Sequence, residues 1–405
     1  MKRAFRILIM LPVCFLALPV VLIIRAVGPW LLIRWGGLVS TRIGHFAANT
    51  ELYLCEQDAG VNVPKQKYLD LFYLAWGPIC NRQLVVMWKR VLRIWPSWIL
   101  APINRVNRLL PASDVHEIGG NTQGSRDVHN LLERFPPHLK FTAAEMARGE
   151  AGLRAIGIPP DAPFVCLIVR EAAYLDAHQP ESDWNYHSYR DSNIQNYVLA
   201  AEELADRGYR VIRMGARVGE AMKTTHPKII DYAKNGMRSD FMDIYLGSKC
   251  DFCVSTATGW DEIPNVFRRP LVAVNLVPLG YIPSYLSNTI CITRHHCLVK
   301  EKRNLTMREI FACNAGFSMQ TSDYASKGIE LIENTPEEVR DVVIEMAERL
   351  NGIWRPHEED EALQQRFWKI FPKDTVDANQ GRPFHGEIRA RFGAHFLRNN
   401  RDWLQ

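Results

Sequence analysis

One stretch decides the fold of this chain: Lys249–Asn275, which reads KCDFCVSTATGWDEIPNVFRRPLVAVN. Cys250–Val254 is a short apolar run, typical of a strand that is covered on both faces. Small hydroxyl residues and a glycine follow, and Trp260–Phe267 then has the composition of a short helix. An Arg-Arg-Pro sequence breaks this helix, and Leu271–Val274 predicts a second buried strand. The stretch is therefore predicted to form a strand, a tight turn, a helix and a strand.

The turn in this stretch has the residues of a phosphate-binding turn. Small residues let the backbone approach a ligand, and the first N–H groups of a helix attract an anion. The predicted ligand donors are Ser255, Thr256, Thr258 and Gly259. Asp261 and Glu262 are further candidates to contact the ligand, although acids at this position also simply favour the helix dipole. An ordinary strand-to-helix turn without a ligand is the alternative interpretation.

The composition limits the classes of protein to which this chain can belong. The chain has 405 residues, enough for two domains plus additions, and 47% of them are hydrophobic, as in a globular protein. The net charge of +5 fits a small anionic ligand or a membrane surface, but gives no case for nucleic acid. Nine scattered cysteines indicate reduced thiols in the cytosol. Cys250 and Cys253 lie inside a predicted strand without a second pair at zinc spacing, so no metal site is predicted.

The N-terminus carries a long apolar run, Ile7–Ile24, with basic residues on both sides. The run is near the minimum length for one membrane span, but Pro12 and Pro19 interrupt it. A single span normally has its positive charge biased to one side. We therefore predict that residues 1–36 form a bent or re-entrant anchor on the cytoplasmic face of the inner membrane. A straight transmembrane anchor is the competing interpretation.

Buried strands alternate with helices along most of the chain. From residue 164 to residue 350 the alternation predicts an α/β domain with a parallel, doubly wound sheet. A weaker alternation of strands and helices precedes it, and begins with a predicted strand at Leu38–Ile43. We predict two Rossmann-like domains that face each other across a cleft, an N-terminal one at residues 37–157 and a C-terminal one at residues 158–352. Helices in residues 353–405 are predicted to pack back on these domains.

Two helices are predicted at the ends of these domains. Thr142–Ile156 has helical spacing and is predicted to close the N-terminal domain, with Gly157–Pro163 as the linker that follows. His385–Phe396 is predicted to be a helix near the end of the chain.

Basic residues follow two of the predicted strands directly. Arg170 precedes a long polar segment, Ala172–Asn193, and Arg213 lies two residues before Gly215. Because ligands bind at the carboxyl ends of parallel strands, we predict that these residues bind the ligand in the cleft. Arg238, just before another helix, is a weaker candidate. The alternative for each arginine is a surface ion pair.

The N-terminal domain offers a candidate base. His45 lies in the turn after the first predicted strand, and a histidine can take a proton near neutral pH. Glu51, one or two turns along the following helix, is the alternative base. A purely structural histidine is the competing interpretation.

Six segments resemble a family of bacterial glycosyltransferases found with surface-polysaccharide genes. They are TRIGHFAANTELYL, YRDSNIQNY, RGYRVIRMG, RSDFMDIYLGSKCDFCVSTATG, SDYASKGIELIENTPEE and HGEIRARFGAHFLRNN, and the resemblance covers nearly everything after the apolar N-terminus. It implies a GT-B architecture, in which the second domain binds a nucleotide-sugar and the first binds the acceptor, with no metal ion or other cofactor. Arg170 is similar to an arginine that meets the donor diphosphate in GT-B fucosyltransferases, but their second basic residue is Glu171 here.

The resemblance implies a membrane-associated glycosyltransferase. It would move a sugar from a nucleotide-sugar donor to a lipid-linked or glycan acceptor, and Asp261 and Glu262 could hold hydroxyl groups of the donor sugar. Transfer requires that the leaving diphosphate is neutralised, which suits arginines and N–H groups, and that the acceptor hydroxyl is deprotonated. The alternatives are a sugar-nucleotide epimerase or glycerol-phosphate transferase of similar plan, and a non-catalytic scaffold of a polysaccharide assembly complex. The chain has no P-loop motif and no G-x-G-x-x-G after a strand, which argues against a P-loop kinase and a nicotinamide enzyme.

Overall fold

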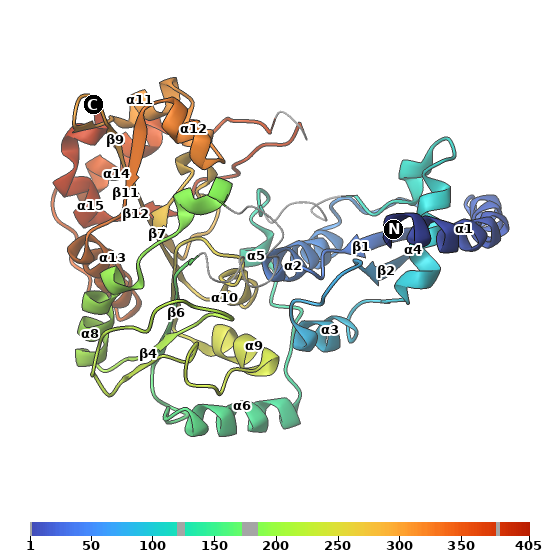
Figure 1. The fold of residues 1–405 in the computed structure, drawn as a ribbon, viewed down its shortest axis with the longest axis horizontal. Coiled ribbons are helices and arrows are strands. Elements are labelled where there is room, and N and C mark those ends of the chain that lie inside the picture. The colour runs from blue at the N-terminus through green and yellow to red at the C-terminus, as the bar shows by residue number, and fades with distance from the viewer. Residues whose placement is uncertain (1, 120–125, 172–184, 378–380) are drawn as a thin grey trace. The chain divides into compact units, whose positions relative to one another are not determined.

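The computed structural model describes residues 2–119, 126–171, 185–377 and 381–405 (Figure 1). The chain divides into two compact units, and each is described by itself. Unit 1 comprises Met1–Ser125 and Leu131–Phe141, and unit 2 comprises Arg126–Asn130 and Thr142–Gln405.

Unit 1 is built on two parallel strands with helices around them. The strands are β1 Leu32–Leu38 and β2 Tyr68–Leu74. The helices are α1 Lys2–Val27, α2 Ile43–Ala59, α3 Arg82–Trp88, α4 Ser97–Asn107 and α5 Leu131–Arg134. Single parallel bridges pair Trp35 with Glu117 and Phe72 with Ile94. Among the described residues, the predicted N-terminal Rossmann-like domain is thus reduced to a two-stranded sheet.

The prediction of a first strand at Leu38–Ile43 is wrong, because β1 lies earlier in the chain. The Arg34 side chain of β1 is buried, and its Nε donates to Oδ1 of Asp70 in β2 at 2.8 Å. Gly36 of the same strand is closely packed, since a Cβ at this position would lie 3.2 Å from Cδ1 of Ile118 and 3.3 Å from Cε1 of Phe72. Because β1 contains a buried charged residue and glycine, its hydrophobicity pattern does not predict a strand.

Helix α1 packs one face on α4 and exposes the other. Ala17 and Val21 are buried in a cluster with Trp35 and residues of α4. The exposed apolar side chains of α1 include Phe15, Leu16, Leu22 and Ile23. The side chains before Cys14, in the first half of the run Ile7–Ile24, lie outside the described part. Within the described part, no helix is both long enough and apolar enough to cross a membrane.

Unit 2 is built on a seven-stranded parallel sheet with the order β12-β8-β7-β6-β3-β4-β5. Its strands are β3 Phe164–Ile168, β4 Arg210–Arg213, β5 Ile229–Ile230, β6 Phe252–Ser255, β7 Leu271–Leu276, β8 Thr289–Thr293 and β12 Arg391–Phe392. From β5 to β8, this is the Rossmann strand order, with β3 and β6 adjacent at its centre. The predicted parallel, doubly wound sheet is therefore confirmed for unit 2.

The helices of unit 2 and a small antiparallel sheet complete the unit. The helices are α6 Ala143–Ala155, α8 Val198–Asp206, α9 Asp240–Lys249, α10 Glu262–Val266, α11 Met307–Ala312, α12 Thr321–Ser326, α13 Pro336–Leu350, α14 Asp360–Ile370 and α15 Ala394–Asn399. The small sheet has the order β10-β9-β11, with β9 His295–Leu298, β10 Arg303–Asn304 and β11 Ile329–Ile332. One core cluster joins residues of β3, β6, β7 and β8 to residues of α8, α13, α14 and α15.

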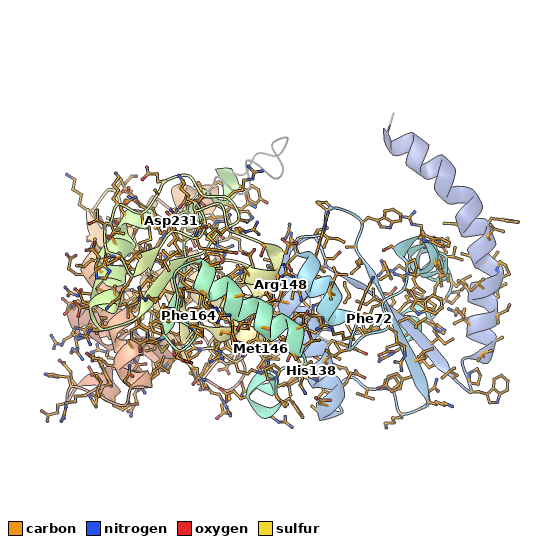
Figure 2. The ribbon with its side chains drawn as sticks, turned by 90° about the horizontal axis from the view of Figure 1, so that it is seen from below. Phe72, His138, Met146, Arg148, Phe164 and Asp231 are labelled. Carbon is orange, nitrogen blue, oxygen red and sulfur yellow. The ribbon has the colours of Figure 1, made fainter. Side chains whose placement is uncertain are left out.

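Helix α6 belongs to unit 2, so the predicted boundary at residue 157 is wrong. A Cβ at Gly149 of α6 would lie 2.1 Å from the Tyr245 ring of α9, so the glycine allows the two helices to approach closely. Figure 2 labels Met146 and Arg148 on the same helix. The Arg148 guanidinium lies 4.2 Å from the ring centroid of Phe241, also in α9. These contacts hold α6 on α9, whereas the sequence assigned the helix to the first domain.

The predicted helix at His385–Phe396 is also wrong in its first part. This segment adds β12 to the edge of the main sheet before the short helix α15 begins. The Phe392 N–H donates to Oε1 of Gln364 in α14 at 3.0 Å. Residues 353–405 thus pack on unit 2 and extend its sheet.

Candidate functional site

The candidate site lies at the carboxyl ends of β3 and β6, the point where the strand order of unit 2 reverses. Ligands of open α/β sheets bind at such a switch point. The Arg170 N–H, two residues after β3, donates to Oγ1 of Thr256 at 2.8 Å. The Thr256 N–H donates back to the Ile168 carbonyl oxygen at 3.3 Å. The structure therefore brings Arg170 together with the turn Ser255–Gly259, as the sequence predicts.

Three arginines gather around Asp191 at this edge of the sheet. Arg170 Nε donates to Asp191 Oδ1 at 3.1 Å. Arg294, directly after β8, donates to the Asp191 carbonyl oxygen. Arg190 donates to the carbonyl oxygen of Ala257, inside the turn that follows β6. The switch point thus carries a group of guanidinium ions, which we call the arginine cluster: Arg170, Arg190 and Arg294.

The arginine cluster is largely withdrawn from water. Burial lowers the pKa of Arg170 and of Arg294, and the like charge of Arg190 lowers that of Arg170 further, but a guanidinium remains charged. Among the described residues, Nε of Arg190 and Nε of Arg294 are buried and have no hydrogen-bond partner. A buried N–H group without a partner is costly. An anion with several acceptor oxygens, such as a phosphate, would satisfy these groups.

The turn after β6 is held by its own side chains. Ser255 Oγ donates to Asp261 Oδ2 at 2.7 Å and accepts from the Thr258 N–H at 3.3 Å. The Trp260 N–H donates to Thr258 Oγ1 at 3.3 Å. Helix α10 has only five residues, so its dipole is small. The predicted anion site at the start of the helix is therefore weak. The guanidinium groups are the stronger hydrogen-bond donors to an anion.

Two acids follow this turn, Asp261, which is buried, and Glu262, which is half-buried. Burial raises the pKa of Asp261 and of Glu262, and the charge of Asp261 raises that of Glu262 further. Glu262 Oε2 accepts a hydrogen bond from Asn265 Nδ2 at 2.8 Å. With its pKa raised to about 8, Glu262 is mostly protonated at pH 7 and can both donate and accept hydrogen bonds, whereas Asp261, with a pKa raised to about 6, is mostly ionised and accepts them. Together the two acids can donate to a ligand and accept from it. This property suits sugar or ribose hydroxyl groups, the role predicted for both acids.

Arg213 does not take the predicted ligand-binding position. Its side chain is 1% exposed and forms ion pairs with Glu171 and with Asp231, the latter at 3.0 Å. Figure 2 labels Asp231 within unit 2. Because two carboxylates already satisfy this guanidinium, Arg213 at the end of β4 binds the segments that follow β3 and β5, and it leaves no charge for a ligand.

Gly215 and Arg238 also have local partners. Gly215 has φ +155°, and a Cβ there would lie 2.6 Å from Cγ1 of Val218, so the position requires glycine for its backbone conformation. Arg238 forms an ion pair with Asp243 in the first turn of α9. Within the described part of the chain, neither residue forms a hydrogen bond or an ion pair with the arginine cluster, so the structure gives no support to either as a ligand contact.

His45 in unit 1 has the properties of a base. It is the third residue of α2 and is half-buried. Burial lowers the pKa of His45, a hydrogen bond with Asn49 opposes this effect, and the positive charge of Arg42 adds to it. The net shift is downward, so the imidazole is neutral near pH 7 and can accept a proton.

The alternative base, Glu51, is inaccessible. Its side chain is 0% exposed, and its Oε1 accepts from the backbone N–H of His138 at 3.2 Å. A carboxylate enclosed in this way cannot reach an acceptor hydroxyl, so the structure does not support Glu51 as a base.

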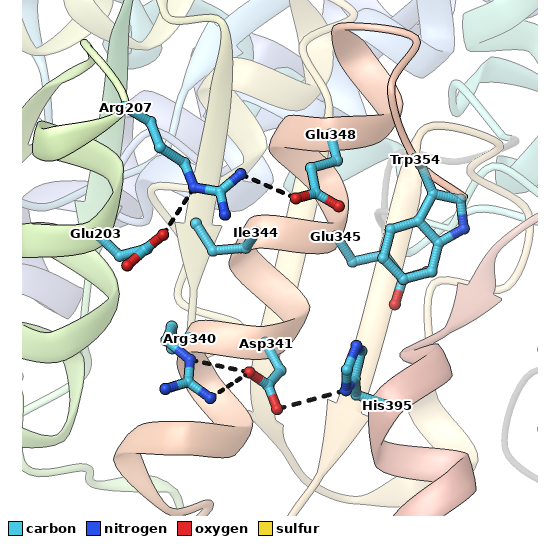
Figure 3. Close-up of a pocket in the computed structure, with 9 residues that line it drawn as sticks. All are labelled: Glu203, Arg207, Arg340, Asp341, Ile344, Glu345, Glu348, Trp354 and His395. Atoms are coloured by element: carbon cyan, nitrogen blue, oxygen red, sulfur yellow. Dashed lines mark hydrogen bonds and ion pairs between the residues drawn. The ribbon is translucent and has the colours of Figure 1, made fainter. Parts of the chain in front are cut away.

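A separate groove of about 290 Å³ is lined by residues of α8, α13 and α15 and by Trp354 (Figure 3). Its charged residues pair among themselves: Arg207 binds Glu203 and Glu348, and Arg340 binds Asp341. Pairs of this kind contribute little, and their charges are already paired, so the groove offers a ligand no unpaired guanidinium. Its one buried N–H group without a partner among the described residues is the neutral indole Nε1 of Trp354. We therefore place the candidate site at the arginine cluster and not in this groove.

Sequence reasoning misses Arg190 and Arg294. Arg294 directly follows the buried strand β8, so the rule that selects Arg170 after β3 also applies to it. Arg190 lies in the polar segment that follows β3, inside the quoted motif YRDSNIQNY. Residues 172–184 of that segment lie outside the described part of the chain.

Comparison with known proteins gives low similarity. No protein-family model and no curated protein matches this chain. Its fold is similar to that of the ADP-heptose lps heptosyltransferase II of E. coli, with 14% identity, a TM-score of 0.39, and coverage of 64% of this chain and 90% of that one. A glycosyl transferase of family 9 from Veillonella parvula DSM 2008 has 12% identity and a TM-score of 0.45, and 79% of this chain covers 97% of it.

A UDP-GlcNAc 2-epimerase from Methanocaldococcus jannaschii is also similar, with 11% identity and a TM-score of 0.29, over 65% of this chain and 88% of that one. These solved structures therefore include a heptosyltransferase, a glycosyl transferase and an epimerase. Likeness at this level assigns no activity, and the functional conclusion rests on the residues of the chain itself.

Proposed function

We propose that this protein is a glycosyltransferase that binds a nucleotide-sugar at the switch point of unit 2. One observation carries the proposal. The arginine cluster presents buried guanidinium N–H groups, two of them without a partner among the described residues, at the carboxyl edge of a sheet with the Rossmann strand order. A diphosphate is the anion that such a site binds most naturally, because it offers several acceptor oxygens and at least two negative charges.

The same groups suit the chemistry of sugar transfer. As the bond between the sugar and the diphosphate breaks, negative charge accumulates on the leaving phosphate oxygen. Fixed guanidinium groups in a site of low polarity stabilise that charge in the transition state. In this proposal, Arg170, Arg190 and Arg294 neutralise the leaving group directly, and the reaction needs no metal ion at the diphosphate.

The acceptor hydroxyl must lose a proton during transfer. In this proposal His45 takes it, because its imidazole is neutral near pH 7 and lies at the start of α2 beyond the carboxyl end of β1. The acceptor would be a lipid-linked or surface glycan bound by unit 1.

Membrane association is a further part of the proposal. Phe15 and Leu16 of α1 are 77% and 70% exposed, and Trp30 beyond the helix is 75% exposed. Apolar and tryptophan side chains of this kind suit the membrane interface. Five buried cysteines fit a cytoplasmic, reducing compartment. If the surface binds lipid, the double variant Leu16→Ser/Ile23→Ser will bind anionic vesicles more weakly in a flotation assay, and equal binding would refute this part.

A thermal-shift screen tests the donor site. The full chain is screened against nucleoside diphosphates and their sugars, because a ligand that binds only the folded state raises the melting temperature. We expect one nucleotide series to raise it by several degrees. Arg294→Gln should lose the shift, and Arg340→Gln, which removes a paired arginine in the groove of Figure 3, should keep it.

The outcomes separate the alternatives. If no nucleotide or nucleotide-sugar changes the melting temperature, the chain is better explained as a scaffold. If a nucleotide-sugar binds and is isomerised without an acceptor, the epimerase alternative is correct. If it binds and the nucleoside diphosphate is released only when a glycolipid acceptor is added, the transferase proposal holds.

A further inference from the structure

Three metal-ligating side chains meet inside unit 1. Glu51 and Cys55 lie one turn apart on α2, and His138 lies in the segment that follows α5 (Figure 2). One ligand atom from each residue lies within 4.8 Å of the other two. His138 Nδ1 is 3.2 Å from Glu51 Oε1, and Cys55 Sγ is 3.9 Å from the same oxygen.

These separations, which run from 3.2 Å to at most 4.8 Å, approach those in the first shell of a tetrahedral ion. With metal–ligand bonds of about 2.0–2.3 Å, neighbouring ligand atoms lie about 3.3–3.6 Å apart. Imidazole nitrogen, thiolate sulfur and carboxylate oxygen are all ligands of zinc in proteins. Small movements of the Cys55 side chain would bring the three atoms to these distances, and the fourth position could take water because His138 is 19% exposed.

A fourth residue orients the histidine. His138 Nε2 lies 3.0 Å from Oδ2 of Asp58, which is one further turn along the same helix. When a carboxylate accepts the Nε2 hydrogen, Nδ1 is left unprotonated and faces Glu51 and Cys55. Histidine ligands of metal ions usually make this contact with a carboxylate.

We propose that Glu51, Cys55 and His138 bind a divalent transition-metal ion such as zinc, with Asp58 as a positioning residue for His138. The ion would join α2 to the segment after α5 and thus stabilise unit 1. In the competing explanation, His138 is simply hydrogen-bonded between two carboxylates. Burial lowers the pKa of His138, but Glu51 and Asp58 outweigh burial and raise it. In that explanation Cys55 remains a thiol that donates a weak hydrogen bond to Glu51 Oε1, whereas metal binding requires its thiolate, so the cysteine separates the two.

Cobalt(II) is the probe for this site. The full chain is stripped with a chelator and titrated with cobalt(II), whose bond to a thiolate gives a charge-transfer absorption in the near ultraviolet. We expect saturation at one equivalent and displacement of cobalt by zinc. Cys55→Ser should abolish the charge-transfer band, and Cys313→Ser, which removes an exposed thiol, should leave it unchanged.

Asp58→Asn tests the positioning role. The Asp58 side chain is 45% exposed, so the variant is expected to fold, and its metal affinity should fall by roughly 10- to 100-fold. The proposal is overturned if the parent chain shows no band at one equivalent of cobalt, if the band survives in Cys55→Ser, or if Asp58→Asn binds as tightly as the parent. Circular dichroism of each variant confirms that a lost band does not reflect unfolding.

Discussion

Replacing His385 tests how unit 2 responds to acid. The His385 side chain is 4% exposed, its Nδ1 lies 2.8 Å from Oγ of Ser284, and it lies 3.4 Å from a guanidinium nitrogen of Arg126. Burial, and then the positive charge of Arg126, lowers the pKa of His385 to about 3. The folded protein therefore keeps this imidazole neutral where the unfolded chain protonates it.

The sign and the size of the effect follow from the two pKa values. The folded pKa is below the unfolded value of about 6.5, so the stability that depends on His385 is intact above pH 6.5 and is lost as pH falls toward 3. Between pH 7 and pH 5 this one group should remove about 2 kcal/mol from the free energy of unfolding.

Urea denaturation at pH 7, 6 and 5, followed by circular dichroism, measures this loss. The variant His385→Asn cannot be protonated and should lose about 2 kcal/mol less than the parent chain over this range. The control is His357→Asn, because the His357 side chain is 64% exposed, and it should behave like the parent. Equal losses in the parent and in His385→Asn would refute the reasoning.

The remaining predictions address the base, the strand pair of unit 1 and a helix contact. His45→Ala should bind the nucleoside diphosphate normally but release none from the donor when acceptor is added; a loss of nucleotide binding would contradict the role as base. Asp70→Asn should cost roughly 3–5 kcal/mol in urea unfolding, because it leaves the buried guanidinium of Arg34 without its charge partner, and a negligible cost would be inconsistent. Gly149→Leu should cost about 1–3 kcal/mol, since its Cβ would lie 2.1 Å from Tyr245; an unchanged melting temperature would show that α6 is not packed this way.

The sequence predicts the centre of unit 2 well. The strands β3, β6 and β7 are continuous apolar runs that end in polar or small residues, and this pattern is typical of a parallel sheet. Arg170 and the turn around Thr256 follow adjacent strands, so the sheet brings them together as expected. Local patterns are sufficient wherever strand order alone places two residues side by side.

Prediction from the sequence is wrong for charged residues whose ion-pair partner lies far away in the chain. Arg213 lies at the carboxyl end of a strand, as Arg170 does, but Glu171 and Asp231 neutralise its charge. No local sequence pattern predicts these two ion pairs. Arg34 makes β1 look polar because its partner Asp70 lies in another strand. Charged residues are assigned to a ligand or to the fold only when their partners are known.

The most direct test of the arginine cluster is a calorimetric titration of the full chain with the preferred nucleoside diphosphate. The parent and Arg340→Gln should bind with the same affinity. Arg294→Gln should bind roughly 10- to 150-fold more weakly, the loss expected when one charge-assisted hydrogen bond is removed. An unchanged dissociation constant in Arg294→Gln, or no binding by the parent, would contradict a diphosphate site at the switch point.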